Sequence, residues 1–221
     1  ILGRPMIYHV YKNVKKCKIL DEVFVATDDQ RIFDTVESFG GKVIMTSPDH
    51  PTGTYRTGEA ARHIEADIIV NAQGDEPLLN PKMIEHTVTP LLCDASLKVT
   101  NLIAKISNIG DYIDSTVVKT AVDKSNFILY FTRSPIPYPK TRQHYVVYKQ
   151  IGLYAFRRDF LFKYVKMEQT NLELIEGIEF LRIIENGYKI KAVITDYNAV
   201  SVDSLSDLIE AEKILRRKKV N

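Results

Sequence analysis

Residues 66–81 place a continuous apolar run directly before a polar turn. The run consists of Ile68, Ile69 and Val70. Such an unbroken β-branched run predicts a strand that is buried on both faces. Gly74 and Pro77 then end the strand and begin a loop. Because ligands of open α/β sheets bind beyond the carboxyl ends of the strands, the polar side chains of this turn are expected where a ligand would lie.

The turn carries two adjacent acids, Asp75 and Glu76. Mg²⁺ takes oxygen ligands and usually shares them with phosphate groups, so two carboxylates at a strand end are a candidate site for it. The same pair is also compatible with an ordinary strand-end turn whose acids are merely solvated, since short motifs often match by chance. This stretch alone leaves both interpretations open.

Strands and helices alternate through the first hundred residues. Predicted strands cover 22–27, 43–45 and 67–71, and a helical pattern follows each strand or the loop after it. Asp29 is expected to cap the helix over 30–38. The alternation predicts parallel βαβ units and an α/β fold, a three-layer α/β/α sandwich with a mostly parallel mixed sheet. The 221 residues, of which 45% are hydrophobic, can form the core of one large domain over 1–221.

The pattern changes between about residues 97 and 156, where four predicted strands follow one another with little helical signal between the last three. We expect a mixed or antiparallel β extension here, either a subdomain or an oligomerisation arm. Residues 133–139 contain three prolines and cannot form a central strand.

Charge and cysteine content exclude several classes of function. There are 30 Lys and Arg against 28 Asp and Glu, so the net charge of +2 gives no argument for nucleic-acid or membrane binding. Cys17 and Cys93 form no C-x-x-C pair, which argues against a disulfide framework or a zinc knuckle. No apolar run approaches transmembrane length. We therefore expect a protein of the reducing cytoplasm.

Nine segments carry a resemblance that extends from Gly3 to near Leu215. They are GRPMIYHV (3–10), VATDD (25–29), TGTYR (52–56), VNAQGDEP (70–77), the strand with Val118 and Lys119, FTRSPIP (131–137), IGLYAFR (151–157), ELIEGIEFLRIIENG (173–187) and VDSLSDL (202–208). In this order they resemble the 3-deoxy-manno-octulosonate (Kdo) cytidylyltransferases, or CMP-Kdo synthetases. The resemblance implies a nucleotide-diphospho-sugar transferase-like fold and a homodimer formed through a small β-rich dimerisation arm.

The resemblance also implies a reaction. CTP would react with the anomeric hydroxyl of Kdo or a related 3-deoxy-2-keto sugar acid, giving the CMP-sugar and pyrophosphate for lipopolysaccharide or surface-sugar biosynthesis. Mg²⁺ would neutralise charge around the α-phosphorus and polarise the sugar hydroxyl. Asp75 and Asp203 would hold this metal and be the catalytic residues. Without the resemblance, Asp203 would be only a turn residue before Ser204, the predicted cap of the last helix.

Contacts to both substrates follow from the same resemblance. On the nucleotide side they are Thr54, Arg56 and Gln73, and on the sugar side Ser134, Gln150, Tyr154, Glu173 and Glu176. Glu173 and Glu176 are three residues apart on a predicted helix and share a face, which a solvated helix would also show. Tyr154 alternates with Phe156 on a strand, a pattern that favours core packing over stacking on a ligand. Lys119 would either meet an anion or extend to solvent.

Four departures from the family pattern matter. The family begins with a strand and a phosphate-binding loop that would precede Ile1, so we expect the sequence to be a fragment of a longer chain. Tyr55 stands where the family has an acid, Gln150 where it has a histidine, and Phe180 where it has an amide. The last two changes predict a different acceptor substrate, such as an amino-substituted Kdo. Kdo itself would leave a buried polar group unpaired at these positions, which costs ~1–3 kcal/mol.

Two other functions remain open on the sequence. A metal-dependent glycosyltransferase would use strand-end acids, either Asp28 and Asp29 or Asp75 and Glu76, and would release no pyrophosphate. A non-catalytic paralogue would bind a nucleotide without turning it over.

Overall fold

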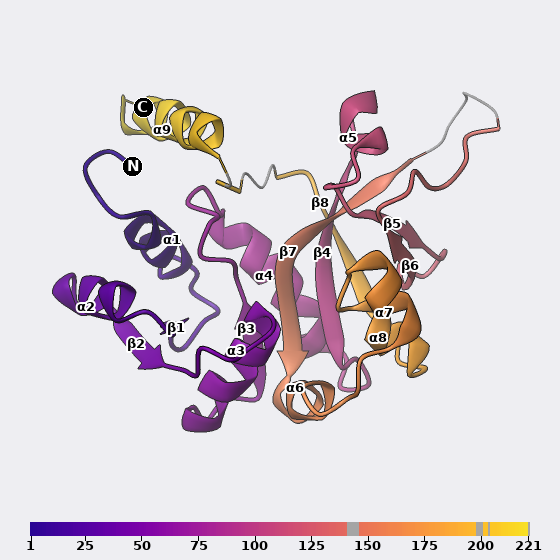
Figure 1. Cartoon of the computed structure of the whole chain (residues 1–221), viewed down its shortest axis with the longest axis horizontal. Coiled ribbons are helices and arrows are strands. Elements are labelled where there is room, and N and C mark those ends of the chain that lie inside the picture. Colours follow the sequence, from indigo (N-terminus) through magenta and orange to yellow (C-terminus); the bar gives the residue numbers. More distant parts are fainter. Residues whose placement is uncertain (141–145, 198–200, 203, 221) are drawn as a thin grey trace. The chain divides into compact units, whose positions relative to one another are not determined.

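The computed structural model describes residues 1–140, 146–197, 201–202 and 204–220. For residues 218–220 it describes only the backbone. The chain forms two compact units. The first contains residues 1–66, 71–85 and the described part of 198–221, and the second contains 67–70 and 86–197. Both combine helices with strands, so the predicted α/β class is confirmed (Figure 1).

The first unit contains a parallel βαβ unit, as the alternation predicts. β1 (Phe24–Thr27) pairs in parallel with β2 (Lys42–Met45), and α2 (Gln30–Ser38) connects them. α2 begins at Asp29, whose carboxylate accepts a hydrogen bond of 2.8 Å from the N–H of Arg31. This contact satisfies one of the free N–H groups of the first turn, so the predicted cap is confirmed.

The other helices of the first unit lie before and after this βαβ unit in the chain. They are α1 (Met6–Val14), α3 (Gly53–Ala60), the 3₁₀ turn η1 (Ala61–His63), the first residues of α4 (Pro81–Cys93), and α9 (Leu205–Val220). In the part of the chain that the structure describes, no helix is long and apolar enough to cross a membrane.

The second unit is built on a six-stranded mixed sheet with the order β6-β5-β7-β4-β8, and β3 pairs with β7 beside this path. The strands are β3 (Ile68–Asn71), β4 (Val99–Lys105), β5 (Lys119–Val122), β6 (Ile128–Thr132), β7 (Tyr148–Arg157) and β8 (Lys191–Thr195). β4 is parallel to β8, whereas β4–β7, β5–β6 and β5–β7 are antiparallel. The mid-chain strands are therefore antiparallel, as expected, but they belong to this main sheet (Figure 1).

The core of the second unit lies on its central strands. Six of the seven residues of β4 are buried, which is typical of a strand covered on both faces. Phe180 is 1% exposed and its ring stacks on Tyr154 with a centroid distance of 4.1 Å. The helices of this unit are α5 (Ile109–Ile113), α6 (Arg158–Tyr164), α7 (Asn171–Glu176), α8 (Leu181–Glu185) and the rest of α4.

The sequence over residues 171–186 predicts a single helix that Asn171 caps and that ends before Gly187, and this prediction is wrong. α7 ends at Glu176, the next residue, Gly177, has a left-handed backbone with φ of 63°, and α8 begins at Leu181. Glycine reaches this conformation without a steric cost and commonly ends helices. The N-cap of α7 is Thr170 and not Asn171, and Glu173 completes a capping box with it.

Candidate active site

The acidic turn after β3 is tied to two other segments of the first unit. The buried amide of Asn71, the last residue of β3, donates to Thr54 Oγ1 of α3 at 3.3 Å. The backbone carbonyl of Asp75 accepts a hydrogen bond of 2.9 Å from the N–H of Val202. Two residues that are 127 positions apart in the sequence are thereby joined at the strand end.

Asp203, the proposed partner of Asp75, lies outside the described residues. The next residue, Ser204, begins α9 with a reciprocal cap: its N–H and hydroxyl donate to Asp207 Oδ2, and its Oγ accepts from the N–H of Asp207 at 3.3 Å. The predicted cap is confirmed. Within the described ranges, no three His, Cys, Asp or Glu side chains are grouped so as to hold a metal ion.

Glu76 is a buried acid directly beside Asp75. Its side chain is 5% exposed. Burial, and to a smaller degree the charge of Asp75, raise the pKa of Glu76 to about 7. Loss of hydration disfavours the charged form of a carboxyl group, and a like charge nearby adds to this effect. In mildly acidic solution Glu76 is therefore protonated beside Asp75.

The raised pKa of Glu76 predicts a pH-dependent stability. Between pH 4.5, the ordinary pKa, and about 7, the folded state keeps a proton that the unfolded state loses. Stability due to this group therefore falls as the pH rises through this window, by about 3 kcal/mol in total, at about 1.4 kcal/mol for each pKa unit. Urea unfolding of metal-free protein should show this slope in the wild type and lose it in Glu76→Gln.

Glu65→Gln serves as the control for this measurement, because Glu65 is exposed and lies just before the same strand. Its unfolding free energy should follow the wild-type pH profile. A Glu76→Gln profile parallel to the wild type would contradict the assignment of the slope to Glu76.

On the nucleotide side, Arg56 of α3 joins the ends of β1 and β2. Its Nη1 donates to Thr46 Oγ1 at 2.7 Å and to the carbonyl of Ser47 at 3.2 Å. Its Nη2 forms an ion pair of 3.0 Å with Asp28. Asp28, one of the acids that a glycosyltransferase would need, thus already has a cationic partner in the protein.

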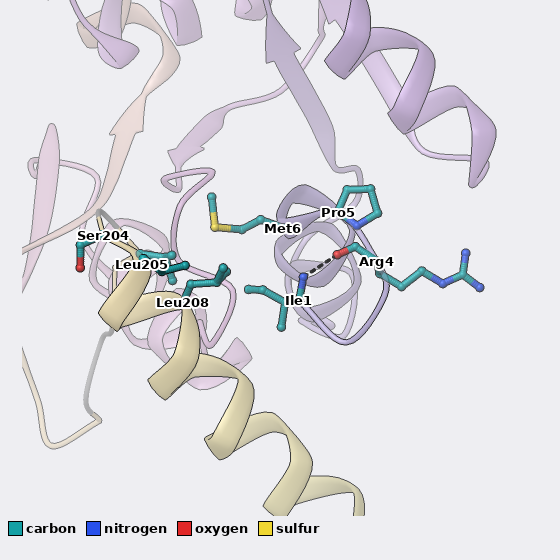
Figure 2. Close-up of a pocket in the computed structure, with 8 residues that line it drawn as sticks. Ile1, Arg4, Pro5, Met6, Ser204, Leu205 and Leu208 are labelled. Carbon is teal, nitrogen blue, oxygen red and sulfur yellow. Dashed lines mark hydrogen bonds between the residues drawn. The ribbon is translucent and has the colours of Figure 1, made fainter.

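A cavity of about 410 Å³ lies in the first unit between the beginnings of α1 and α9. It is lined by Ile1, Arg4, Pro5, Met6, Val202, Ser204, Leu205 and Leu208. In Figure 2 the apolar side chains of Ile1, Met6 and Leu208 lie toward one another, while the side chain of Arg4 extends away from them. Val202, which binds the backbone of Asp75, forms part of the wall.

On the sugar side, all five predicted residues lie in the second unit. Gln150 and Tyr154 are on β7, opposite Ile103 and Asn101 of β4. Tyr154 is 8% exposed and stacks on Phe180, so its ring packs in the core as the strand alternation suggested. A contact of Tyr154 with the sugar stays a prediction.

Glu173 is held inside the second unit. Its side chain is 5% exposed and forms a two-pronged ion pair with Arg182, which is 0% exposed. Arg182 Nε donates to Glu173 Oε2 at 2.7 Å, Nη2 donates to Oε1, and the N–H of Thr170 also donates to Oε2. Both carboxylate oxygens are engaged within the protein, and a sugar contact of Glu173 stays a prediction.

Glu176, three residues later, has different partners. Its Oε1 accepts from Thr132 Oγ1 at 2.7 Å and its Oε2 accepts from the N–H of Arg133 at 2.9 Å. The Arg133 Nε donates in turn to the carbonyl of Glu176 at 2.8 Å. Ser134 follows directly and donates its N–H to Thr132 Oγ1. Glu176 therefore fixes the chain that leaves β6, where Ser134 lies exposed.

Lys119 of β5 shows a contact that the sequence did not reveal. Its side chain donates to the carbonyls of Asp114 and Val117, both at 2.7 Å, and the residue is 0% exposed. Burial lowers the pKa of Lys119. The expected extension into solvent is wrong. The hydrogen bonds of Arg133 with Glu176 were not predicted either. The only sequence signal for Arg133 is its position within the FTRSPIP segment.

Comparison with known proteins gives consistent matches. The cytidylyltransferase family model matches residues 1–190. The 3-deoxy-manno-octulosonate cytidylyltransferases of Geobacter metallireducens and Geotalea uraniireducens are 43% and 44% identical to the chain, covering 98% and 99% of it and 90% of each relative. The structure of CMP:2-keto-3-deoxy-manno-octonic acid synthetase complexed with CTP superposes with a TM-score of 0.94, at 36% identity over 99% of this chain and 90% of that one.

Proposed function

The chain belongs to the family of 3-deoxy-manno-octulosonate (Kdo) cytidylyltransferases, and from this premise we propose how its residues carry out the reaction. It is a nucleotidyltransferase that couples CTP to Kdo or a closely related sugar acid and releases pyrophosphate. One observation carries this conclusion: the TM-score of 0.94 to a CMP-Kdo synthetase complexed with CTP, over 99% of the chain.

The reaction requires that the negative charge around the α-phosphorus of CTP be neutralised. The anomeric oxygen of the sugar acid attacks the α-phosphorus of CTP, the bond from that phosphorus to the bridging oxygen breaks, and pyrophosphate leaves with its electron pair. The hydroxyl of the sugar loses its proton. Anionic oxygens around the phosphorus repel the nucleophile, so positioning and electrostatic stabilisation provide most of the catalysis.

We propose that Asp75 and Asp203 hold a Mg²⁺ ion. The donor set fits this metal, since Mg²⁺ takes one or two carboxylates and completes its shell with water and substrate phosphates. The hydrogen bond from Val202 to Asp75 supports the pairing of the two segments. When bound, the ion would neutralise phosphate charge and polarise the sugar hydroxyl.

Separate sets of residues are proposed to contact the two substrates. Thr54, Arg56 and Gln73 of the first unit are proposed to contact the nucleotide, and in this structure Arg56 is already fixed by the ends of β1 and β2. In the second unit, Gln150 and the residues around it are proposed to contact the sugar acid. Phe180 is a core ring stacked on Tyr154, and it stands at the position in the sequence where the family has an amide. We therefore propose an acceptor that differs from Kdo at that position, such as an amino-substituted Kdo.

Pyrophosphate release tests the function and the acceptor together. With CTP and Mg²⁺, the protein should release pyrophosphate only when a 3-deoxy-2-keto sugar acid is present, and an amino-substituted Kdo should give a higher kcat/KM than Kdo. The highest kcat/KM with Kdo itself would contradict the altered acceptor. Transfer of a sugar from an intact sugar nucleotide, without release of pyrophosphate, would instead establish a glycosyltransferase.

We also propose a homodimer formed through the mid-chain region of residues 131–156. The described part of this region exposes large apolar side chains, with Tyr138 at 86% and Val146 at 50%, and β6 is an edge strand. Such residues are commonly covered in a dimer interface. Native mass spectrometry should give twice the chain mass of 25.3 kDa, and a monomer at micromolar concentration would contradict the dimer.

A further inference from the structure

The buried polar atoms of the second unit without a hydrogen-bond partner among the described residues include Asn101 Oδ1, Thr120 Oγ1 and Gln150 Nε2, which lie on neighbouring strands of the sheet. A buried polar atom that has lost water without gaining a partner destabilises the folded state. Such atoms are rare in native proteins, and each one calls for an explanation, often a functional one.

The strand register places Thr120 and Gln150 on the same face of the sheet. Thr120 of β5 lies directly opposite Tyr148 of β7, and Gln150 follows Tyr148 by two residues. Residues opposite each other, and residues two apart on one strand, point to the same side. Diagonal neighbours of this kind are within reach of each other when one side chain is long.

This face is the one that Phe180 covers. Thr120 is also opposite Phe131 of β6, whose ring lies 6.4 Å from that of Phe180. Tyr154, four residues beyond Gln150 on β7, stacks on the same ring at 4.1 Å. Thr120 therefore lies on the same face of the sheet as Gln150 and Tyr154, two of the residues proposed to contact the sugar acid, and no sequence motif pointed to it.

The three atoms differ in what else their side chains do. The Asn101 amide donates to the carbonyls of Ile151 and Leu153, at 2.9 and 3.2 Å, where the register between β4 and β7 shifts. Asn101 therefore has a structural role at this irregularity. Thr120 is 1% exposed and its hydroxyl has no such role in the described part of the chain. A valine would fill the same volume without a buried hydroxyl.

Gln150 supplies the complementary group. Its Nε2 is buried, whereas its Oε1 is not among the buried atoms without a partner, and the residue as a whole is half-buried. A threonine oxygen accepts a hydrogen bond and an amide nitrogen donates one, so each of the two unpartnered atoms can satisfy the other. Diagonal neighbours are within reach of a long side chain, so a change in the Gln150 rotamer is the movement that this pairing requires.

We propose that Thr120 is a positioning residue for acceptor recognition. Its hydroxyl accepts a hydrogen bond from Gln150 Nε2 when the sugar acid binds, which fixes Gln150 Oε1 as an acceptor for a hydroxyl or amino group of the sugar. The inference rests on the proposed function, because it concerns the same acceptor site. It also predicts that the sugar acid must carry a hydrogen-bond donor that binds Gln150 Oε1.

The test uses Thr120→Val and Thr120→Ser, with Thr100→Val as a matched control. Thr100 is another buried threonine of the same sheet, but its hydroxyl donates to the carbonyl of Thr87 at 2.7 Å. Thr120→Val should raise the KM for the sugar acid about tenfold, leave the KM for CTP unchanged, and keep or raise the melting temperature. Thr120→Ser should restore acceptor binding. Thr100→Val should lower the melting temperature without changing either KM.

A double variant separates positioning from a direct contact. If Thr120 acts through Gln150, Thr120→Val should change nothing further in a Gln150→Leu background, because coupled residues are not additive. Additive effects, or an unchanged acceptor KM in Thr120→Val, would overturn the inference while wild-type pyrophosphate release leaves the proposed function intact. A wild type that releases no pyrophosphate with any sugar acid would overturn the proposed function and this inference with it.

Discussion

Asp75→Asn should reduce the rate of CTP- and sugar-dependent pyrophosphate release about a thousandfold. Losing a carboxylate that holds the catalytic metal removes several kcal/mol of transition-state stabilisation, and about 4 kcal/mol corresponds to three powers of ten. Asparagine keeps the size of the side chain and removes only its charge. The loss should lie mainly in kcat, and a raised Mg²⁺ concentration should recover part of it.

Two comparisons make the Asp75→Asn result specific. Asp67→Asn makes the same chemical change at an exposed residue just before β3, and its activity should match the wild type. The melting temperature of metal-free Asp75→Asn should not fall, because the change removes a charge next to buried Glu76. Activity within tenfold of the wild type across a Mg²⁺ titration would exclude Asp75 as the metal ligand.

Local sequence signals predicted the elements that carry Asp75. β3 follows from three consecutive β-branched residues, and the turn after it follows from Gly74 and Pro77, so both depend only on neighbours in the chain. The caps at Asp29 and Ser204 were predictable for the same reason, since a cap is formed within one helical turn.

The break between α7 and α8 was missed because two local signals conflicted. The apolar spacing across 172–184 continues through Gly177 and indicated one helix, whereas the glycine favours an end. A glycine inside a helix costs only about 1 kcal/mol, so the sequence alone does not decide between the two. Packing decides it, since the break lets Phe180 reach Tyr154 and Phe131.

The partners of the site residues could not be predicted at all. The hydrogen bond between Val202 and Asp75 joins segments far apart in the chain, and the diagonal placement of Thr120 and Gln150 depends on strand order and register. Neither is encoded by spacing along the chain. The three-residue separation of Glu173 and Glu176 indicated that both lie on one face of a helix. In the structure, however, Glu173 forms an ion pair with Arg182, whereas Glu176 accepts a hydrogen bond from Thr132 at the end of β6.

Removing one partner of the buried ion pair between Glu173 and Arg182 should strongly destabilise the protein. Both side chains are buried, at 5% and 0% exposure. Forming such a pair gives little net stability, because both charges lose their water, but removing one partner leaves a buried charge uncompensated. Arg182 also donates to the carbonyl of Met167 at 3.0 Å and lies over the Tyr164 ring, so its guanidinium connects α6, α7 and α8.

Arg182→Met should therefore lower the free energy of unfolding by about 3–5 kcal/mol, measured by urea denaturation. Glu173→Gln should have a similar effect, and the double variant should lose less than the sum because it contains no unpaired charge. Asp159→Asn, which breaks the exposed pair with Lys98, is the control and should change stability little.

The same variants distinguish a structural Glu173 from a sugar-binding one. If the carboxylate serves only Arg182 and the cap of α7, Glu173→Gln and Arg182→Met should lower stability alike and raise the acceptor KM alike, because both loosen the helices that cover Tyr154. If Glu173 binds the sugar acid, Glu173→Gln should raise the acceptor KM far more than Arg182→Met at equal loss of stability. Equal effects of the two substitutions would show that Glu173 is structural, whereas a larger effect of Glu173→Gln on the KM for the sugar acid would show that Glu173 binds this substrate.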